Sequence, residues 1–486
     1  MSRRMSILLA VFALALPFAD SRVMGQATQS AELSQLEDRA KSGNADAMLR
    51  LGYLYDTGKG VGQDYVQAMS WYRKAADAGD AQAMNNVGVL YENGSGVARD
   101  YAAAMAWYRK SADAGDTAAL GHIGDLYCYG RGVAKDFAQA MAWDKKAADA
   151  GNSSGMYGIG MLYENGDGMP QDYGQAMGWF KKAADASNTD AECDIGYLYE
   201  NGFGVAQDDA QAMDWYRKAA DGGNSTAMKD IGVLYNDGRG VPRDFAQAMQ
   251  WYKKAADAGN GNAMFSIGYL YDRGAGVPQD YGQALAWYKK AVAADDTTAI
   301  NNIGFLYQLG HGVPKDDAAA MSWYRKGADA GNADAMCNIG YIYDHGQGVA
   351  QDYAQAMKWY QQAADAGSAL AENDLGDLYY YGHGVLPDNA TALSWYRKAA
   401  GAGDVTGMDN VAFMYEKSLG IVHDYAQALA WFSKSADAGD ANAMYNLGVL
   451  YERGLGVKAD PDQALTWYKK AADAGDANAI KRLQKK

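Results

Sequence analysis

Every tryptophan of this 486-residue chain lies 36 residues from the next one. The twelve residues are Trp71, Trp107, Trp143, Trp179, Trp215, Trp251, Trp287, Trp323, Trp359, Trp395, Trp431 and Trp467. A fixed period of this length predicts consecutive copies of one supersecondary element, which stack because a single copy cannot bury its own apolar face. The first complete repeat spans residues 45–80 and the twelfth spans residues 441–476.

The first part of each repeat predicts a helix, called helix A. In the first repeat its apolar residues recur at helical spacing and are Ala47, Met48, Leu51, Leu54 and Tyr55. Gly58 and Gly60 follow, and we expect them to end the helix because glycine adopts left-handed backbone conformations readily. Gly52 lies inside the helix despite its low helix propensity, so we expect another helix to approach closely there.

The second part of each repeat predicts another helix, helix B. Asp64 is its expected N-cap, and aspartate occupies this position in all twelve repeats. The apolar side of helix B in the first repeat is Ala68, Met69, Trp71, Tyr72, Ala75 and Ala76. Gly79 is expected to end it. This assignment places the tryptophans in the core, so we expect Trp215→Ala to cost about 3–5 kcal/mol of local stability.

The two ends of the array look like half-repeats with polar outer sides. Residues 28–44 are expected to form an N-terminal capping helix in which Gln35 takes the tryptophan position, and residues 477–486 a basic C-terminal cap. Residues 45–476 hold the twelve repeats. The predicted fold is therefore all-α: a right-handed α-solenoid of twelve 36-residue helix-turn-helix repeats with polar half-repeat caps.

The repeat motif is A-x-A-M-x-x-L-G-x-L-Y-x-x-G-x-G-V-x-x-D-Y-x-x-A-x-x-W-Y-x-K-A-A-x-x-G. It resembles the Sel-one-like repeat, a relative of the tetratricopeptide repeat, over nearly the whole chain that follows residue 44. The resemblance implies an adaptor or scaffold protein, and many bacterial members of the family are exported. It also implies that helix A lines the concave groove of the array.

Residues 1–27 predict a cleavable signal peptide. Arg3 and Arg4 precede an apolar run over residues 7–16, and Gly25-Gln26-Ala27 is the preferred of several small-residue cleavage sites. We therefore expect a periplasmic or secreted protein without membrane insertion after signal removal. The net charge of −15 disfavours nucleic acid and anionic lipid surfaces as partners.

No residue pattern supports an enzyme or a resident cofactor. Gly58-Lys59-Gly60 resembles a phosphate-binding loop, but it recurs in every repeat and follows no predicted strand. The motifs S-x-x-K and H-E-x-x-H are absent. We expect neither catalytic nor metal-binding residues and no cofactor.

The strongest candidate for a metal site is His122, Asp125 and Cys128, which lie along one predicted helix. It lacks a fourth ligand or an open position with a clear purpose. Cys193 and Cys337 occupy equivalent positions four repeats apart, too distant for a disulfide. We expect three cysteine thiols without disulfide bonds.

Some repeats depart from the motif. Glu192 and Glu372 replace a core methionine, Asp144 replaces the aromatic residue after tryptophan, and Ala412 and Ser418 replace glycines. Such departures mark either a functional or bent site or the drift that a long array tolerates.

The variable positions of helix A are the expected binding surface. In the first repeat they are residues 46, 49, 50 and 53, which share one helix face away from the core. The candidate partner-binding residues, mostly aromatic with aspartates among them, are Tyr53, Asp125, Tyr157, Tyr197, Phe265, Tyr269, Phe305, Tyr341, Asp377 and Phe413. Aromatic anchors beside acidic groups suit an extended or helical peptide that carries basic residues.

The leading interpretation is an exported, monomeric, non-enzymatic scaffold that binds a protein or peptide along helix A. The alternative is a cell-wall or glycan-binding protein with weak hydrolase activity, because exposed aromatic rings also stack on sugars. A third, more distant interpretation is a soft-metal buffer that uses methionine and cysteine.

Overall fold

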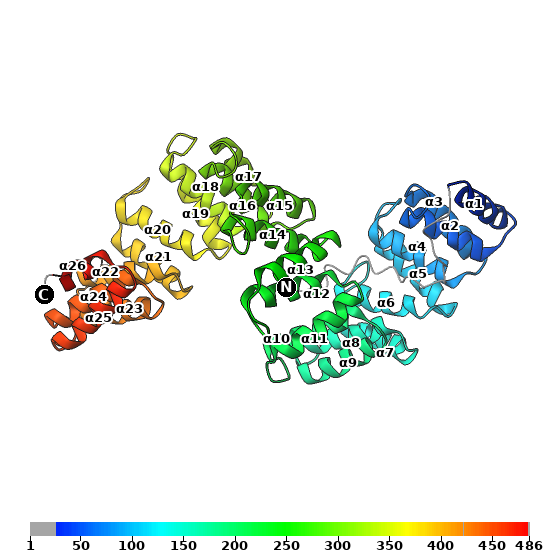
Figure 1. Cartoon of the computed structure of the whole chain (residues 1–486), viewed down its shortest axis with the longest axis horizontal. Helices are drawn as coiled ribbons and strands as arrows, with labels where there is room; N and C mark the ends of the chain where they lie inside the picture. The colour runs from blue at the N-terminus through cyan, green and yellow to red at the C-terminus, as the bar shows by residue number, and fades with distance from the viewer. Residues whose placement is uncertain (1–25, 421, 485–486) are drawn as a thin grey trace. The chain divides into compact units, whose positions relative to one another are not determined.

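The computed structural model describes residues 26–420 and 422–484, with side chains from residue 32 onward. The predicted signal peptide therefore lies outside the described residues, apart from residues 26 and 27 at the start of the first helix. Within the described part, 26 α-helices and no strands are present (Figure 1). The helices fall into two compact units that divide between Asp244 and Phe245, and each unit is treated by itself below.

The helices of unit 1 are α1 (Gln26–Lys41), α2 (Ala45–Thr57), α3 (Tyr65–Asp77), α4 (Ala81–Asn93), α5 (Tyr101–Asp113), α6 (Ala118–Tyr129), α7 (Phe137–Asp149), α8 (Ser153–Asn165), α9 (Tyr173–Asp185), α10 (Thr189–Asn201), α11 (Asp209–Asp221) and α12 (Ser225–Asp237). The helices of unit 2 are α13 (Phe245–Asp257), α14 (Gly261–Arg273), α15 (Tyr281–Ala293), α16 (Thr298–Leu309), α17 (Asp317–Asp329), α18 (Ala333–His345), α19 (Tyr353–Asp365), α20 (Ala369–Tyr381), α21 (Asn389–Gly401), α22 (Val405–Lys417), α23 (Tyr425–Asp437), α24 (Ala441–Arg453), α25 (Pro461–Asp473) and α26 (Ala477–Gln484).

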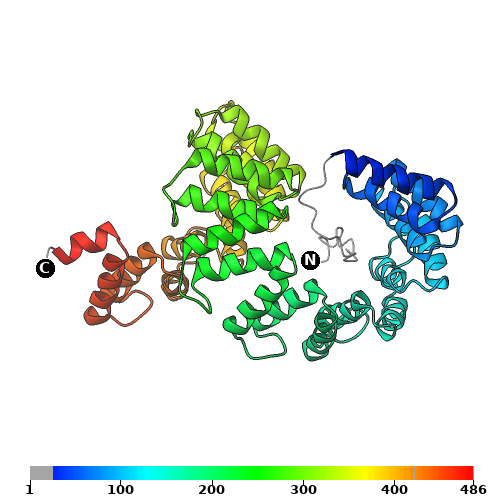
Figure 2. The same ribbon diagram turned by 45° about the vertical axis from the view of Figure 1, so that its right-hand side comes forward.

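Each unit is a stack of helix pairs, as the two views in Figures 1 and 2 show. The even-numbered helices α2 to α24 are the predicted helices A, and the odd-numbered helices α3 to α25 are the predicted helices B. Helices A of successive repeats contact each other at α6 and α8, α14 and α16, and α20 and α22. In each unit helices A form one layer, called the inner layer because the resemblance to the tetratricopeptide repeat implies that helix A lines the concave groove. The all-α solenoid prediction is confirmed.

Caps define the start and end of each helix. The Asp64 carboxylate accepts hydrogen bonds from the backbone N–H groups of Val66 and Gln67, which confirms it as the N-cap of helix B. Gly58 ends helix A in the left-handed conformation, with φ at 69°, and its N–H donates to the carbonyl of Leu54. The sequence analysis missed the N-cap of helix A, which in the first repeat is Asn44.

The glycine inside helix A faces the buried tyrosine of helix B. Tyr72 is 1% exposed, and a Cβ atom added to Gly52 would lie 2.4 Å from its Cδ1 atom. The same pairing recurs in later repeats, for example between Gly304 and Tyr324. The glycine therefore makes room for the tyrosine ring, which packs against the backbone of helix A and holds the two helices together.

The tryptophans are partly buried and pack against the apolar clusters, so the prediction that they lie in the core is confirmed only in part. Trp215 packs at the edge of the apolar cluster that includes Phe180 and Ile195. The Lys74 ammonium lies 3.9 Å from the centroid of the Trp71 ring, and eleven of the twelve tryptophans carry a lysine in this way. The lysine forms a cation–π contact that covers the outer side of the indole.

The second glycine of each interhelical turn contacts the preceding repeat. A Cβ atom on Gly96 would lie 2.7 Å from the carbonyl oxygen of Tyr65, at the start of α3. Gly132 meets the backbone of Tyr101 in the same way. This turn therefore also serves as a joint between repeats, a role that only glycine can take at so close an approach.

Half-repeats cover both ends, as expected. Leu33 and Leu36 of α1 pack against Ala47 and Leu51 of α2. At the other end, Arg482 of α26 pairs with Glu452. These contacts cover the apolar surfaces that the first and last repeats would otherwise expose. No helix among the described residues is long and apolar enough to cross a bilayer.

The irregular repeats are compensated by local contacts. Asp144 is 2% exposed, and added Cβ atoms on Gly124 and Gly158 would collide with its carboxylate. Glu192 is 5% exposed and forms an ion pair with Lys218 at 3.1 Å. Ser418 takes the place of a helix-ending glycine and adopts its left-handed conformation, with φ at 60°.

Candidate binding surface on helix A

The predicted aromatic column is most exposed in unit 2. It occupies position 9 of the repeat, counted with Ala45 as position 1. Its exposed members are Tyr269 at 43%, Phe305 at 49%, Tyr341 at 39% and Phe413 at 38%. They lie on helices α14, α16, α18 and α22, which all belong to the inner layer. Large aromatic side chains are rarely left this open in a repeated column unless a partner covers them.

Position 13 forms a second exposed column, which the sequence analysis missed. In the same unit its residues are Arg273, Leu309, His345, Tyr381, Lys417 and Arg453, and all six are exposed. Each lies one helical turn after position 9, so the two columns share a face. The Tyr341 and His345 rings stack with centroids 4.0 Å apart. The i, i+4 spacing from the aromatic column is the signal that would have found these residues.

In unit 1 the position-9 column is less exposed than in unit 2. The Tyr53 hydroxyl accepts a hydrogen bond from Lys59, and the Tyr197 ring lies edge-on to Phe203 with centroids 5.8 Å apart. Asp125 is partly buried. Met161, which also occupies position 9, is 3% exposed. Unit 1 therefore lacks the continuous open aromatic face of unit 2.

Tyr157 is not on an open face, so its predicted placement is wrong. It is 8% exposed and belongs to the apolar cluster of α8 to α10. Its hydroxyl donates to an Asp194 carboxylate oxygen at 2.8 Å. Phe265 is partly buried as well and packs on Tyr288, with ring centroids 5.5 Å apart.

The hydrogen bond of Tyr157 is one of a series of side-chain hydrogen bonds between neighbouring helices A. Each of them joins position 5 of one repeat to position 6 of the next. Asn338 donates to Asn301 and Asn410 donates to Asn373, both at 2.8 Å. The sequence analysis assigned positions 5 and 6 to the binding surface. These hydrogen bonds instead connect neighbouring helices A within the inner layer.

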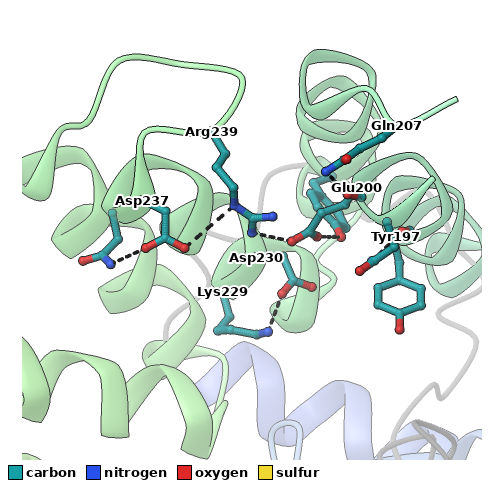
Figure 3. Close-up of polar contacts among 10 residues, drawn as sticks. Tyr197, Glu200, Gln207, Lys229, Asp230, Asp237 and Arg239 are labelled. Carbon is teal, nitrogen blue, oxygen red and sulfur yellow. Dashed lines mark hydrogen bonds and ion pairs between the residues drawn. The ribbon is translucent and has the colours of Figure 1, made fainter. Parts of the chain in front are cut away.

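Most repeats carry a carboxylate at position 12. In the fifth repeat it links helix A, helix B and the interhelical turn of the next repeat. In the fifth repeat, the Tyr216 hydroxyl and the Arg239 guanidinium both donate to Glu200, each at 2.5 Å (Figure 3). Arg239 belongs to the interhelical turn of the next repeat. In the same view Tyr197 points away from this pair. Burial and the nearby carboxylates of Asp230 and Glu200 raise the pKa of Tyr216 well above its ordinary value of 10, so its hydroxyl stays a donor.

The residues considered for metal binding serve in packing. His122 stacks on Tyr108, with ring centroids 4.7 Å apart. The described residues contain no group of three or more histidines, cysteines or acidic residues placed to hold a metal ion. Cys128, Cys193 and Cys337 are buried and form no disulfide, as expected.

Residues 151–155 match the G-x-S-x-G pattern of hydrolase nucleophiles, a match that the sequence analysis passed over. Ser153 is 7% exposed and begins α8 directly after the turn that follows α7. A nucleophile elbow needs a strand before the serine and an open position for it. Neither is present at Ser153.

Comparisons with known proteins agree with this architecture. The model of a family described as Sel1 repeat matches residues 45–80, 81–116, 117–152, 153–188, 189–224, 225–260, 261–296, 297–332, 333–368, 369–404, 406–440 and 441–476. A comparison with curated proteins gives no match.

Two examples represent the solved structures that are similar to the chain. The first is a protective antigen present in uropathogenic Escherichia coli strains that displays an SLR fold. It is 34% identical, covers 93% of this chain and 97% of its own, and superposes with a TM-score of 0.53. The second is a Sel1 repeat protein from Oxalobacter formigenes, which is 36% identical, covers 52% of this chain and 100% of its own, and has a TM-score of 0.46.

Proposed function

This chain belongs to the Sel1 repeat family, and we propose that it is a scaffold that binds a protein or peptide partner along positions 9 and 13 of the helix-A layer in unit 2. Proteins of this family are generally non-enzymatic scaffolds, and the solenoid fold suits that role. The partner would lie along the inner layer, where successive helices present equivalent positions at a regular spacing.

The observation that carries the proposal is the pair of exposed columns. Tyr269, Phe305, Tyr341 and Phe413 are each more than a third exposed, whereas the tyrosines of helix B, such as Tyr324, are fully buried. The same residue type is thus used for packing on one helix and left open on the other. Exposed aromatic side chains of this kind supply much of the binding energy in protein interfaces, because they bury a large area at low entropic cost.

The test replaces three of these anchors together: Tyr269→Ala, Phe305→Ala and Tyr341→Ala. We expect recovery of the specific partner from an envelope extract to fall about tenfold or more, because each anchor removed from an interface commonly costs more than 1 kcal/mol. Quantitative mass spectrometry of the captured proteins measures this loss.

The matched control is Leu386→Ala with Val422→Ala. These residues are 87% and 86% exposed, but they lie in interhelical turns away from helix A. The control should recover the partner as well as the unchanged chain does. Equal recovery by the triple variant would contradict the proposed surface. Retention on purified wall polymer that depends on the three anchors would instead favour the glycan-binding alternative.

We also propose that the chain is exported. The basic and apolar pattern of residues 1–27 supports this proposal. The similar protein from uropathogenic Escherichia coli is described as a protective antigen, which agrees with a location accessible from outside the cell. Expressed with its own first 27 residues, the chain should appear in the periplasm or medium and begin near residue 28. N-terminal sequencing after cell fractionation checks this, and an intact chain retained in the cytoplasm would contradict export.

A further inference from the structure

The tenth repeat departs from most of the others at position 9 of the proposed surface and at the adjacent position 12. Position 9 holds Asp377 among the aromatic residues of its neighbours, and position 12 holds Tyr380 where most repeats carry a carboxylate. The buried Tyr396 hydroxyl, which would otherwise donate to position 12, donates to Asp377 Oδ1 at 2.7 Å. In this repeat the carboxylate therefore lies at position 9, on the exposed face, one helical turn before position 12.

Aromatic side chains surround this carboxylate. Tyr381 is the most exposed aromatic residue among the described large hydrophobic side chains, at 62%. His383 stacks on Tyr381 and on Tyr353, with ring centroids 5.6 Å and 4.6 Å apart. Tyr380 lies edge-on to Tyr381 at 4.8 Å and to Phe413 at 6.4 Å. The rings therefore form one contiguous cluster, supported from behind by ring-to-ring contacts.

The cluster is rich in negative charge. Asp344 and Asp374 lie near Asp377, and burial together with the charge of Asp344 raises the Asp377 pKa above its ordinary value. No lysine or arginine among the described residues forms an ion pair with Asp374 or Asp377. Lys417, the nearest basic residue on the position-13 column, pairs with Glu416 at 2.7 Å, and its ammonium lies 6.0 Å from the centroid of the Phe413 ring.

We propose that Asp377, Tyr380, Tyr381, His383 and Phe413, called the repeat-10 patch, bind an arginine side chain of the partner. The proposal rests on the proposed function, because it names the chemistry of one contact on the same surface. Guanidinium is planar, stacks on aromatic rings and donates in-plane hydrogen bonds to a carboxylate. Among the described residues Asp377 Oδ2 receives no hydrogen bond, so it is the acceptor for such a donor. A lysine would satisfy the charge but not the stacking.

The test uses two small probes, N-acetyl-arginine methylamide and N-acetyl-citrulline methylamide. They have nearly the same shape, but citrulline carries no charge. Saturation-transfer difference NMR with the purified full chain gives both dissociation constants. We expect arginine to bind about tenfold more tightly than citrulline, because the charged hydrogen bond and the cation–π contact are both lost in citrulline.

Two variants locate the site. Asp377→Asn and Tyr381→Ala should each weaken arginine binding about fivefold or more. Asp365→Asn is the control, because Asp365 is an exposed carboxylate at the end of α19, a helix B, and lies outside positions 9 and 13 of helix A. It should leave arginine binding unchanged. Circular dichroism checks that all three variants stay folded.

Equal affinity for the two probes would overturn the proposal, and so would equal losses in Asp377→Asn and Asp365→Asn. The proposed function can fail separately. If the repeat-10 patch binds no arginine while the variant with Tyr269, Phe305 and Tyr341 replaced still loses the partner, the scaffold proposal stands and only the arginine contact is wrong. If arginine binds but the triple variant recovers the partner normally, the arginine-binding patch is supported and the proposed partner-binding surface is contradicted.

Discussion

Replacing Tyr216 by alanine should lower the free energy of unfolding by about 3–5 kcal/mol, the range for large aromatic residues removed from a packed core. Tyr216 is fully buried, and its ring lies against Gly196, where a Cβ atom would approach within 2.7 Å. Its hydroxyl also donates to Glu200. Because the glycine leaves no side chain to fill the space, the cavity left by alanine cannot collapse easily. Urea unfolding followed by far-UV circular dichroism measures the loss.

Two further variants of the same repeat separate the contributions. Tyr216→Phe keeps the ring and should cost only about 1 kcal/mol, the typical net value of one hydrogen bond. Phe180 and Phe432 already occupy this position in two repeats. Trp215→Ala should cost about 2 kcal/mol, because the indole is only partly buried and less apolar surface is lost. A larger loss for Trp215→Ala than for Tyr216→Ala would contradict the assignment of tyrosine as the main core residue of helix B.

Replacing Asp374 by asparagine should stabilise the chain at pH 8 and leave it almost unchanged at pH 4. Burial, together with the charges of Asp377, Asp344 and Asp404, raises the pKa of Asp374 from 3.8 to about 7. In the unfolded chain the carboxyl returns to its ordinary pKa. The folded protein therefore binds the extra proton between these two values, and stability falls as the pH rises from about 4 to about 7.

Asparagine carries no charge and removes this dependence. The gain at pH 8 should be about 1–3 kcal/mol, less than the full linkage value because Asp374 is partly exposed. The mirror variant is Asn338→Asp, at the same position of the preceding repeat, where Asn338 now donates to Asn301. It should destabilise the chain at pH 8 and have little effect at pH 4. Thermal unfolding at both pH values checks the pair, and a pH-independent effect of Asp374→Asn would show that its carboxyl is not the titrating group.

The candidate surface was only partly predictable. The variable positions of helix A pointed to Tyr269, Phe305, Tyr341 and Phe413, which are exposed as expected of a binding face. Tyr157 belonged to the same set but is buried, because its position 5 meets position 6 of the next repeat. A helical wheel of one helix cannot reveal this, since the contact joins two residues of neighbouring repeats that are 37 residues apart in the sequence.

The sequence by itself determined the repeat, its length, the order of its two helices, the N-cap of helix B and the glycine that ends helix A. A period of 36 residues, a capping aspartate and glycines after helix A are local signals, and local signals fix local backbone. What only the tertiary structure decided is how much of each side chain the neighbouring repeats cover. The tryptophans that first revealed the array are partly buried at the edges of the apolar clusters, with lysines over their rings, while the tyrosines beside them fill the core. The reason is geometric: exposure depends on the distance between stacked helices, and the spacing along one helix does not contain that distance.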